Sequence, residues 1–216
     1  MNLSVYLMKS VEVVTLMVGW YYFRNLSKSY KLFVIYVSFS VLVGLLERYL
    51  IVILGSNHIL YHFYSPIEFC FIIIGILLLI NIDSLKTKAL LIIIPYLMFW
   101  IYAKLTLEPL NQMANVSIAV ANTIVFIVAV FGSLRIALTS FGSIFRDPRI
   151  TLIIGILIYF GGSIIIFALS NLIFQEGEIP AKSLWKIHNG MHILFNFIMI
   201  YSFYLVDLQS KLADDK

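Results

Sequence analysis

The chain has 216 residues, of which 62% are hydrophobic and 12% are charged, and its formal net charge is +4. A soluble domain is about half apolar and about a quarter charged, so this composition excludes a soluble protein and predicts that a lipid bilayer surrounds most of the surface. The basic residues fall mainly in alternate loops rather than on one patch, which predicts no nucleic-acid partner. The single cysteine, Cys70, excludes an intramolecular disulfide and a site built from several thiolates.

Seven apolar segments follow one another with short connections, and each is long enough for a membrane span of about 20 residues. The predicted fold class is an all-α integral membrane protein, a bundle of seven transmembrane helices forming a single domain over residues 1–216. The first segment contains Lys9 and Glu12 and lacks a small-residue cleavage pattern, so we expect a span there rather than a cleaved signal peptide. Pro66 predicts a kink in the third span. The predicted spans are residues 3–23, 32–54, 58–81, 89–107, 113–137, 150–174 and 183–206.

The distribution of lysine and arginine predicts an orientation. The connections after the first, third and fifth spans hold three, two and three of these residues, where the last count includes Arg135 at the end of the fifth span, and the C-terminal tail holds two. The connection after the second span has none, that after the fourth has only Lys104 at its edge, and the start of the seventh has Lys182 and Lys186. By the positive-inside rule the N-terminus is outside and the C-terminus is cytoplasmic. The small chain and its use of isoleucine and lysine favour a bacterial inner (cytoplasmic) membrane.

Several ionisable residues lie within the predicted spans, where they usually face one another or a water-filled cavity. In the predicted topology they fall in the outer halves of the first, second, third and seventh spans, which indicates an outward-facing polar pocket. Arg48 points away from its neighbour Glu47 on a helix, so we expect it to pair across helices with Glu12 or Glu68. A structural ion pair and a ligand clamp are both open, and interhelical hydrogen bonds alone would explain the asparagines. The candidates for this pocket or ion pair are Glu12, Glu47, Arg48, Asn122, Asn189 and Asn196.

All four histidines occur in two pairs with i,i+4 spacing, His58 with His62 and His188 with His192. This spacing places both rings of a pair on one helix face, where they can converge on one ion. We therefore expect these four residues as metal ligands, with Zn²⁺ as the most suitable ion, although iron, nickel and copper also bind imidazole. Glu68 could supply an oxygen ligand or a general base. The alternative is that the histidines are hydrogen-bonded or solvated side chains near the membrane interface.

The start of the seventh span resembles a known histidine pair. His188 and His192 are similar to the pair of the seven-helix zinc hydrolases that include the alkaline ceramidases and the progestin and adipoQ receptors. In that superfamily a serine lies four residues before a third histidine and an aspartate follows it, whereas here His58 precedes His62 and Glu68 follows. The resemblance implies zinc held by His62, His188 and His192, with Glu68 taking a proton from the bound water.

The same span argues against retinal. Retinal-binding proteins need a lysine midway along the last helix, and here Lys186 lies at its start while Asn196 occupies its middle. Trp185, His188, Asn189, His192 and Asn196 instead form one stripe, which we expect to face the bundle interior.

Two functions follow from the sequence. One is a zinc-dependent membrane hydrolase acting on a lipid-like amide or ester that enters from the bilayer. The other is a non-enzymatic receptor or sensor of a ligand, an ion or pH, which signals to a separate cytoplasmic partner. Imidazoles titrate near neutral pH, so external pH is a candidate input for the second.

Overall fold

The computed structural model describes residues 3–139, 146–175 and 178–214, and it contains seven helices and no strand within them. All seven helices are long and apolar enough to cross a membrane, which confirms the prediction of a multi-pass helical bundle. In lipid every backbone polar group needs an internal partner, and a helix supplies one. The helices are α1 (Leu3–Tyr22), α2 (Lys28–Leu54), α3 (His58–Leu79), α4 (Leu85–Thr106), α5 (Asn115–Thr139), α6 (Pro148–Gln175) and α7 (Glu178–Asp214).

The largest differences from the predicted boundaries lie at charged helix ends. Helix α2 begins at Lys28 rather than at residue 32, α4 begins at Leu85 rather than at residue 89, and α7 continues to Asp214. Hydropathy detects the apolar part of a helix, but lysine and other long polar residues also favour the helical backbone, so the helices extend past the apolar segments. Helix α2 ends at Gly55, whose φ of 72° is the left-handed conformation that glycine adopts without steric cost.

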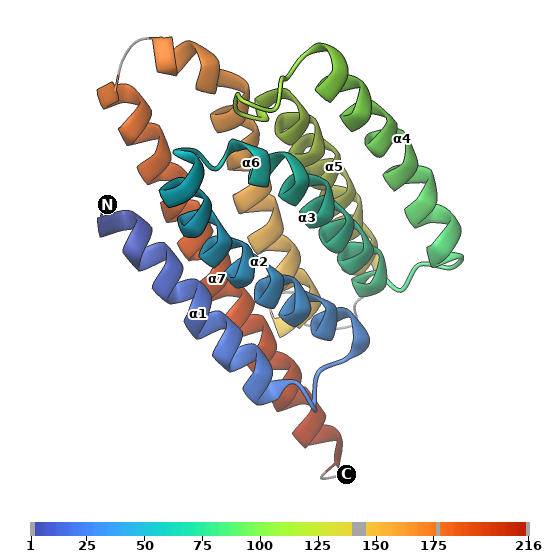
Figure 1. Ribbon diagram of the computed structural model, residues 1–216. Coiled ribbons are helices and arrows are strands. Elements are labelled where there is room, and N and C mark those ends of the chain that lie inside the picture. Colours follow the sequence, from blue (N-terminus) through green and yellow to red (C-terminus); the bar gives the residue numbers. More distant parts are fainter. Residues whose placement is uncertain (1–2, 140–145, 176–177, 215–216) are drawn as a thin grey trace.

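Six helices form a closed ring, and the seventh packs outside it. Around the ring each helix contacts the next in the order α1, α2, α3, α5, α6 and α7, and α7 closes the ring against α1. Helix α4 contacts α3 and α5 from outside and lies at the edge of the bundle (Figure 1). Successive helices run in opposite directions, so the two chain termini lie at opposite ends of the molecule (Figure 1). We call the end that holds the N-terminus the N-terminal end and the other the C-terminal end.

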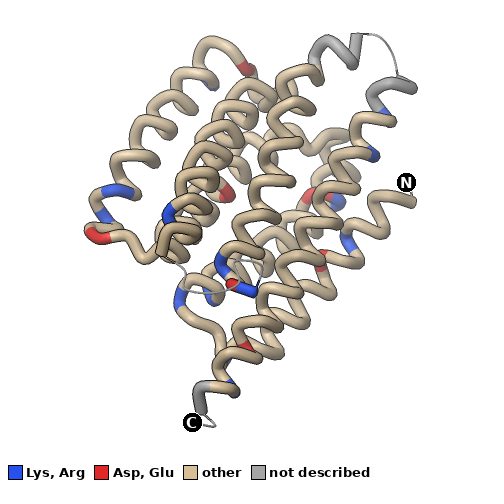
Figure 2. Tube along the Cα trace, turned by 180° about the vertical axis from the view of Figure 1, so that it is seen from behind, with Lys and Arg blue, Asp and Glu red and all other residues tan. Residues whose placement is uncertain are grey.

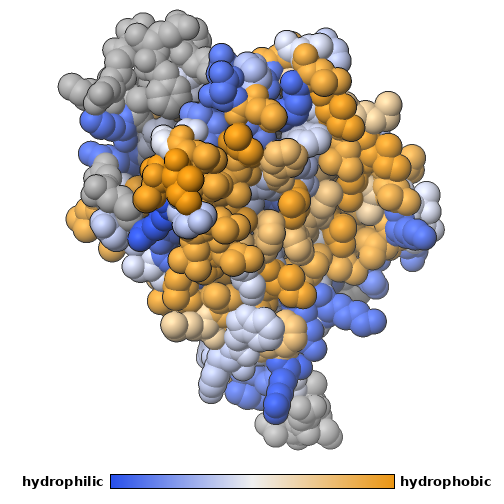
Figure 3. Space-filling model, viewed as in Figure 1, coloured by the Kyte–Doolittle hydropathy of each residue, from blue (hydrophilic) through white to orange (hydrophobic). Residues whose placement is uncertain are grey.

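The middle of the interior is apolar. Phe33, Phe69, Ile72, Ile76 and Phe203 are at most 1% exposed and belong to one hydrophobic cluster. Apolar side chains also cover most of the middle of the surface (Figure 3), as expected where lipid is the solvent. Many of the lysines and arginines lie near the two ends of the bundle (Figure 2).

Helix α3 continues through Pro66 because another helix supplies the missing hydrogen bond. Proline has no N–H, so the carbonyl of His62, four residues earlier, loses its helical donor. The indole Nε1 of Trp100 on α4 donates to this carbonyl at 3.0 Å. The proline thus couples α3 to the peripheral helix α4.

Candidate functional site

A cavity of about 410 Å³ opens among the ring helices at the N-terminal end. One wall is apolar and is made by Met113, Ala114, Ile118, Phe167 and Trp185, which pack as a small hydrophobic cluster separate from the main core. The rest of the lining carries polar groups, so the cavity is amphipathic. Its polar lining residues are Lys9, Glu47, Asn57, His58, Tyr61, His188 and Asn189. All six ring helices contribute to the lining, whereas α4 does not.

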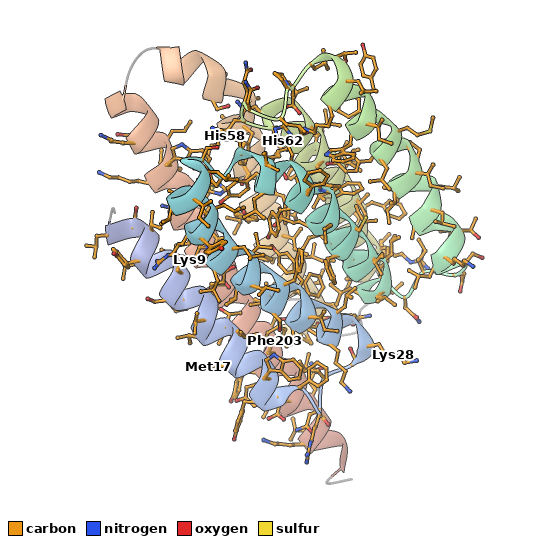
Figure 4. The ribbon with its side chains drawn as sticks, viewed as in Figure 1. Lys9, Met17, Lys28, His58, His62 and Phe203 are labelled. Atoms are coloured by element: carbon orange, nitrogen blue, oxygen red, sulfur yellow. The ribbon has the colours of Figure 1, made fainter. Side chains whose placement is uncertain are left out.

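A smaller chamber of about 70 Å³ shares part of this lining. Lys9, Glu47, Tyr61 and His188 border both spaces, so the chamber and the cavity are neighbours. Figure 4 shows Lys9 on the N-terminal half of α1 and His58 at the start of α3. The additional polar residues of the chamber are Glu12, Ser40, Tyr64, Tyr159 and His192.

An ion pair lies in the wall of this chamber. The Nζ atom of Lys9 lies 3.2 Å from Oε2 of Glu12. The hydroxyl of Ser40 on α2 donates a hydrogen bond to Oε1 of the same carboxylate. Glu12 is 2% exposed, so its charge is compensated inside the protein by one ammonium and one hydroxyl. The sequence analysis expected Arg48 as a partner across helices, but the residue three positions earlier on the same helix takes that place.

A chain of hydrogen bonds continues from Glu12 toward the middle of the bundle. The hydroxyl of Tyr64 on α3 lies 3.3 Å from Oγ of Ser40 and 3.1 Å from Oε1 of Glu68. A hydroxyl has one proton, so Tyr64 donates to one of these oxygens at a time. The hydroxyl of Tyr36 donates to the same Glu68 oxygen at 2.7 Å. Glu68 is thus bonded to tyrosines of α2 and α3, and none of the histidines contacts it through a hydrogen bond.

Glu47 faces the cavity without a basic partner. Its Oε1 atom accepts a hydrogen bond from Nδ2 of Asn57 at 2.7 Å, and it makes no ion pair with any residue that the structure describes. Arg48 is exposed, and its guanidinium lies 5.8 Å from the centre of the Tyr6 ring. The predicted pairing of Arg48 with Glu12 or Glu68 is therefore wrong, because Arg48 lies over a ring on the outer side of α1.

A groove between α1 and α2 reaches the ion pair from the outer surface. This groove has a volume of about 420 Å³ and is lined by residues that include Tyr6, Lys9, Glu12 and Arg48. Gly44 also borders it, and a Cβ atom at this position would lie 2.6 Å from Nζ of Lys9. The absence of a side chain at Gly44 is therefore what allows the lysine to lie against α2.

His188 and His192 lie in an aromatic setting on α7. The ring of Tyr159 lies 5.5 Å from that of His188 and 5.3 Å from that of His192, between ring centres. Nδ1 of His188 lies 3.4 Å from the Ser163 hydroxyl, and Nδ1 of His192 lies 3.2 Å from Nδ2 of Asn196. Both histidines border the chamber, and only His188 also borders the cavity.

His62 faces a different part of the bundle from His58. Its Nε2 atom lies 2.9 Å from the carbonyl oxygen of Gln112, in the connection between α4 and α5, and therefore carries the proton of that hydrogen bond. The side chain is fully buried and borders neither the cavity nor the chamber. The structure thus brings His58 and His188 to one cavity, while His62 holds the connection that carries Met113 and Ala114.

A buried ion pair joins the last turn of α4 to that connection. Nζ of Lys104 lies 2.6 Å from Oε2 of Glu108, and the two side chains are 9% and 3% exposed. Glu108 also accepts hydrogen bonds from the backbone N–H groups of Val116 and Ser117 in the first turn of α5, where free N–H groups attract a carboxylate. Burial alone would raise the pKa of Glu108, but the hydrogen bonds from Lys104 and Ser117 together lower it by a larger amount. The pKa of Glu108 therefore lies below its usual range.

The three candidate asparagines have different surroundings. Nδ2 of Asn189 donates to the hydroxyl of Ser4 at 3.2 Å, and the residue borders the cavity. Asn196 donates to the carbonyl oxygen of His192 at 2.9 Å. Asn122 is buried on α5 and borders neither space.

The side chains that could bind a metal ion lie apart from one another. Among residues 3–139, 146–175 and 178–214 there is no group of three or more histidine, cysteine, aspartate or glutamate side chains that could hold a metal ion. The separation of His62 from His188 and His192 accounts for much of this result.

No protein-family model, no curated protein and no solved structure matches the chain.

Proposed function

We propose that this protein is a seven-helix membrane receptor or sensor that binds a small ligand in the cavity at its N-terminal end. One observation carries the proposal: all six ring helices contribute side chains to a single amphipathic cavity of about 410 Å³. Small-molecule sites in proteins are concave spaces of roughly this size with apolar walls and a few polar groups. A ligand held there would contact every ring helix and could therefore alter their packing.

The apolar core supports binding over conduction through the bundle. Beyond Glu68 the interior is occupied by Phe69, Ile72, Ile73 and Ile76 of α3, all at most 1% exposed. No polar groups continue the hydrogen-bond chain through this layer of the described structure. A cavity that is polar at one end and closed by packed side chains below it favours a binding role.

The proposal places the cavity outside and the C-terminal end in the cytoplasm. The C-terminal end carries the more basic connections, and the positive-inside rule assigns such connections to the cytoplasm. A receptor with this orientation would signal to a separate partner through these basic segments. They include Arg24, Lys28, Lys31, Lys86, Lys88, Arg146, Arg149 and Lys211.

The zinc-dependent hydrolase stays an untested prediction. It requires His62 to join His188 and His192 around one ion, and Glu68 to reach the bound water. In the described conformation His62 bonds to Gln112 and Glu68 bonds to two tyrosines, so the receptor fits the arrangement better.

A thermal-unfolding screen with two matched methionine variants tests the receptor. Met8 and Met17 both lie on α1, but Met8 borders the cavity and the chamber, whereas Met17 is 65% exposed on the outer surface. We expect small molecules that bind the cavity to raise the unfolding temperature of purified wild type and Met17→Trp, but not that of Met8→Trp, whose indole fills the space. If no compound in a chemically diverse library stabilises the wild type, or if Met8→Trp responds equally, the proposal is wrong.

A further inference from the structure

The charges around the cavity do not balance. Two carboxylates, Glu12 and Glu47, border the cavity or the chamber, and Lys9 is the one lysine or arginine that does so in the described part of the chain. Lys9 pairs with Glu12 at 3.2 Å. The second carboxylate, Glu47, has no lysine or arginine beside it among the described residues.

Glu12, the other carboxylate that borders these spaces, has a cationic partner that Glu47 lacks. Glu68 also has no basic partner, but two tyrosine hydroxyls donate to it and it borders neither space. Glu47 accepts from the amide of Asn57 and from the hydroxyl of Tyr61, both neutral groups, and the neighbouring Arg48 lies over Tyr6 instead. A carboxylate at the wall of an enclosed space within a membrane protein is costly without an opposite charge.

The rest of the cavity suits an organic cation. Tyr61, Phe167 and Trp185 present aromatic rings to the same space, and the rings of Phe167 and Trp185 lie 5.9 Å apart in a T-shaped contact. Aromatic faces attract ammonium groups through their quadrupole, and the attraction grows when water is excluded. The aliphatic residues of the apolar wall can take a hydrocarbon substituent.

From this juxtaposition we infer that the ligand is an amine or quaternary ammonium compound with an apolar substituent, whose cationic group pairs with Glu47. The inference rests on the proposed ligand-binding function of the cavity and names the chemical class of its ligand. A bare metal ion fits less well, because the described residues contain no group of three or more histidine, cysteine, aspartate or glutamate side chains that could hold one.

Three probes that share a phenyl ring and differ in charge test the inference. They are phenethylammonium, neutral 2-phenylethanol and 3-phenylpropionate, and their dissociation constants are measured by calorimetry on the full-length protein in detergent at pH 7.5. We expect phenethylammonium to bind at least about tenfold more tightly than the other two. In Glu47→Gln the advantage of the cation is lost, while the affinity for 2-phenylethanol is unchanged and shows that the cavity remains folded.

The control variant is Asp83→Asn, which removes a carboxylate from the exposed turn between α3 and α4 and is expected to keep the preference for the cation. Tighter binding of 3-phenylpropionate, equal binding of all three probes, no binding of the cation, or an unaltered preference in Glu47→Gln would each overturn the inference. If the anion binds the wild type more tightly than the cation, or all three probes bind it equally, and Met8→Trp abolishes that binding, the receptor proposal stands while the ligand class is wrong. A failure of the receptor proposal itself appears in the methionine screen, which does not depend on charge.

Discussion

Removing one member of the Lys104–Glu108 pair should strongly destabilise the bundle, because the partner would remain charged and buried. The two groups lie 2.6 Å apart with side chains 9% and 3% exposed, and Nζ of Lys104 also lies 2.9 Å from the hydroxyl of Ser117. Glu108→Gln keeps an oxygen that can accept from the first turn of α5 but loses the charge. Breaking a buried ion pair on one side costs about 3–5 kcal/mol of unfolding free energy.

A double-mutant cycle isolates the pair from the other contacts of each side chain. Lys104→Met retains most of the side-chain volume and leaves Glu108 charged, so we expect it to cost a similar free energy. In the double variant no uncompensated charge remains, and the loss should be smaller than the sum of the two single losses by about 1–3 kcal/mol. Equilibrium unfolding in mixed micelles with a rising fraction of sodium dodecyl sulfate, followed by circular dichroism, measures these differences.

The cycle would refute the reasoning in either of two ways. Losses below about 0.5 kcal/mol in both single variants would mean that the pair behaves like an exposed surface salt bridge. Additive losses would mean that each residue stabilises the protein through other contacts. Either result would also weaken the view that this connection is a fixed wall of the cavity.

Three further predictions concern the same end of the molecule. Folding lowers the pKa of Glu108, so this residue stabilises the folded protein at pH values above the ordinary glutamate pKa of about 4.3. This contribution is lost as the pH falls below that value. Glu108→Gln should therefore flatten that part of the curve of stability against pH. Gly190→Ala should stabilise α7 by up to about 1 kcal/mol, because a Cβ atom there meets nothing within 4 Å. Gly44→Ala should stabilise α2 by less, because its Cβ atom displaces the ammonium group of Lys9. Equal gains would contradict the close approach of Lys9 to α2. A cysteine at Asn111, which is exposed in the connection between α4 and α5, should react with a membrane-impermeant maleimide on intact cells when the native cysteine is replaced by serine; protection until lysis would reverse the proposed orientation.

The helices could be predicted from the sequence because lipid restricts the possible structures. A segment that crosses a bilayer must satisfy its own backbone hydrogen bonds, so a long apolar stretch is almost always a helix. The arrangement of the helices is less accessible. Nothing in the hydropathy of residues 85–106 places α4 outside the ring, because packing depends on side-chain shapes and on bonds such as that from Trp100 to the carbonyl of His62.

The candidate site was predicted less completely. The i,i+4 spacing of His58 and His62 correctly implies neighbouring positions on α3, but four residues also turn the helix by about 40° and advance it by about 6 Å. Because α3 lies between the ring interior and α4, this offset is enough to direct His58 to the cavity and His62 to Gln112. The pairs Lys9–Glu12 and Lys104–Glu108 have spacings of three and four residues, so their sequence signal was present.

The cost of charge in a membrane makes Glu47 the informative residue. Four acidic groups in the described part of the chain have a basic partner, in the ion pairs Lys9–Glu12, Lys104–Glu108, Arg149–Asp147 and Lys211–Asp207. Arg48 is exposed near the end of α2, where a long side chain can extend to the lipid headgroups. Glu47 is held by Asn57 beside an amphipathic cavity and has no cation next to it among the described residues. A ligand that carries a positive charge would supply the counter-ion that this carboxylate lacks.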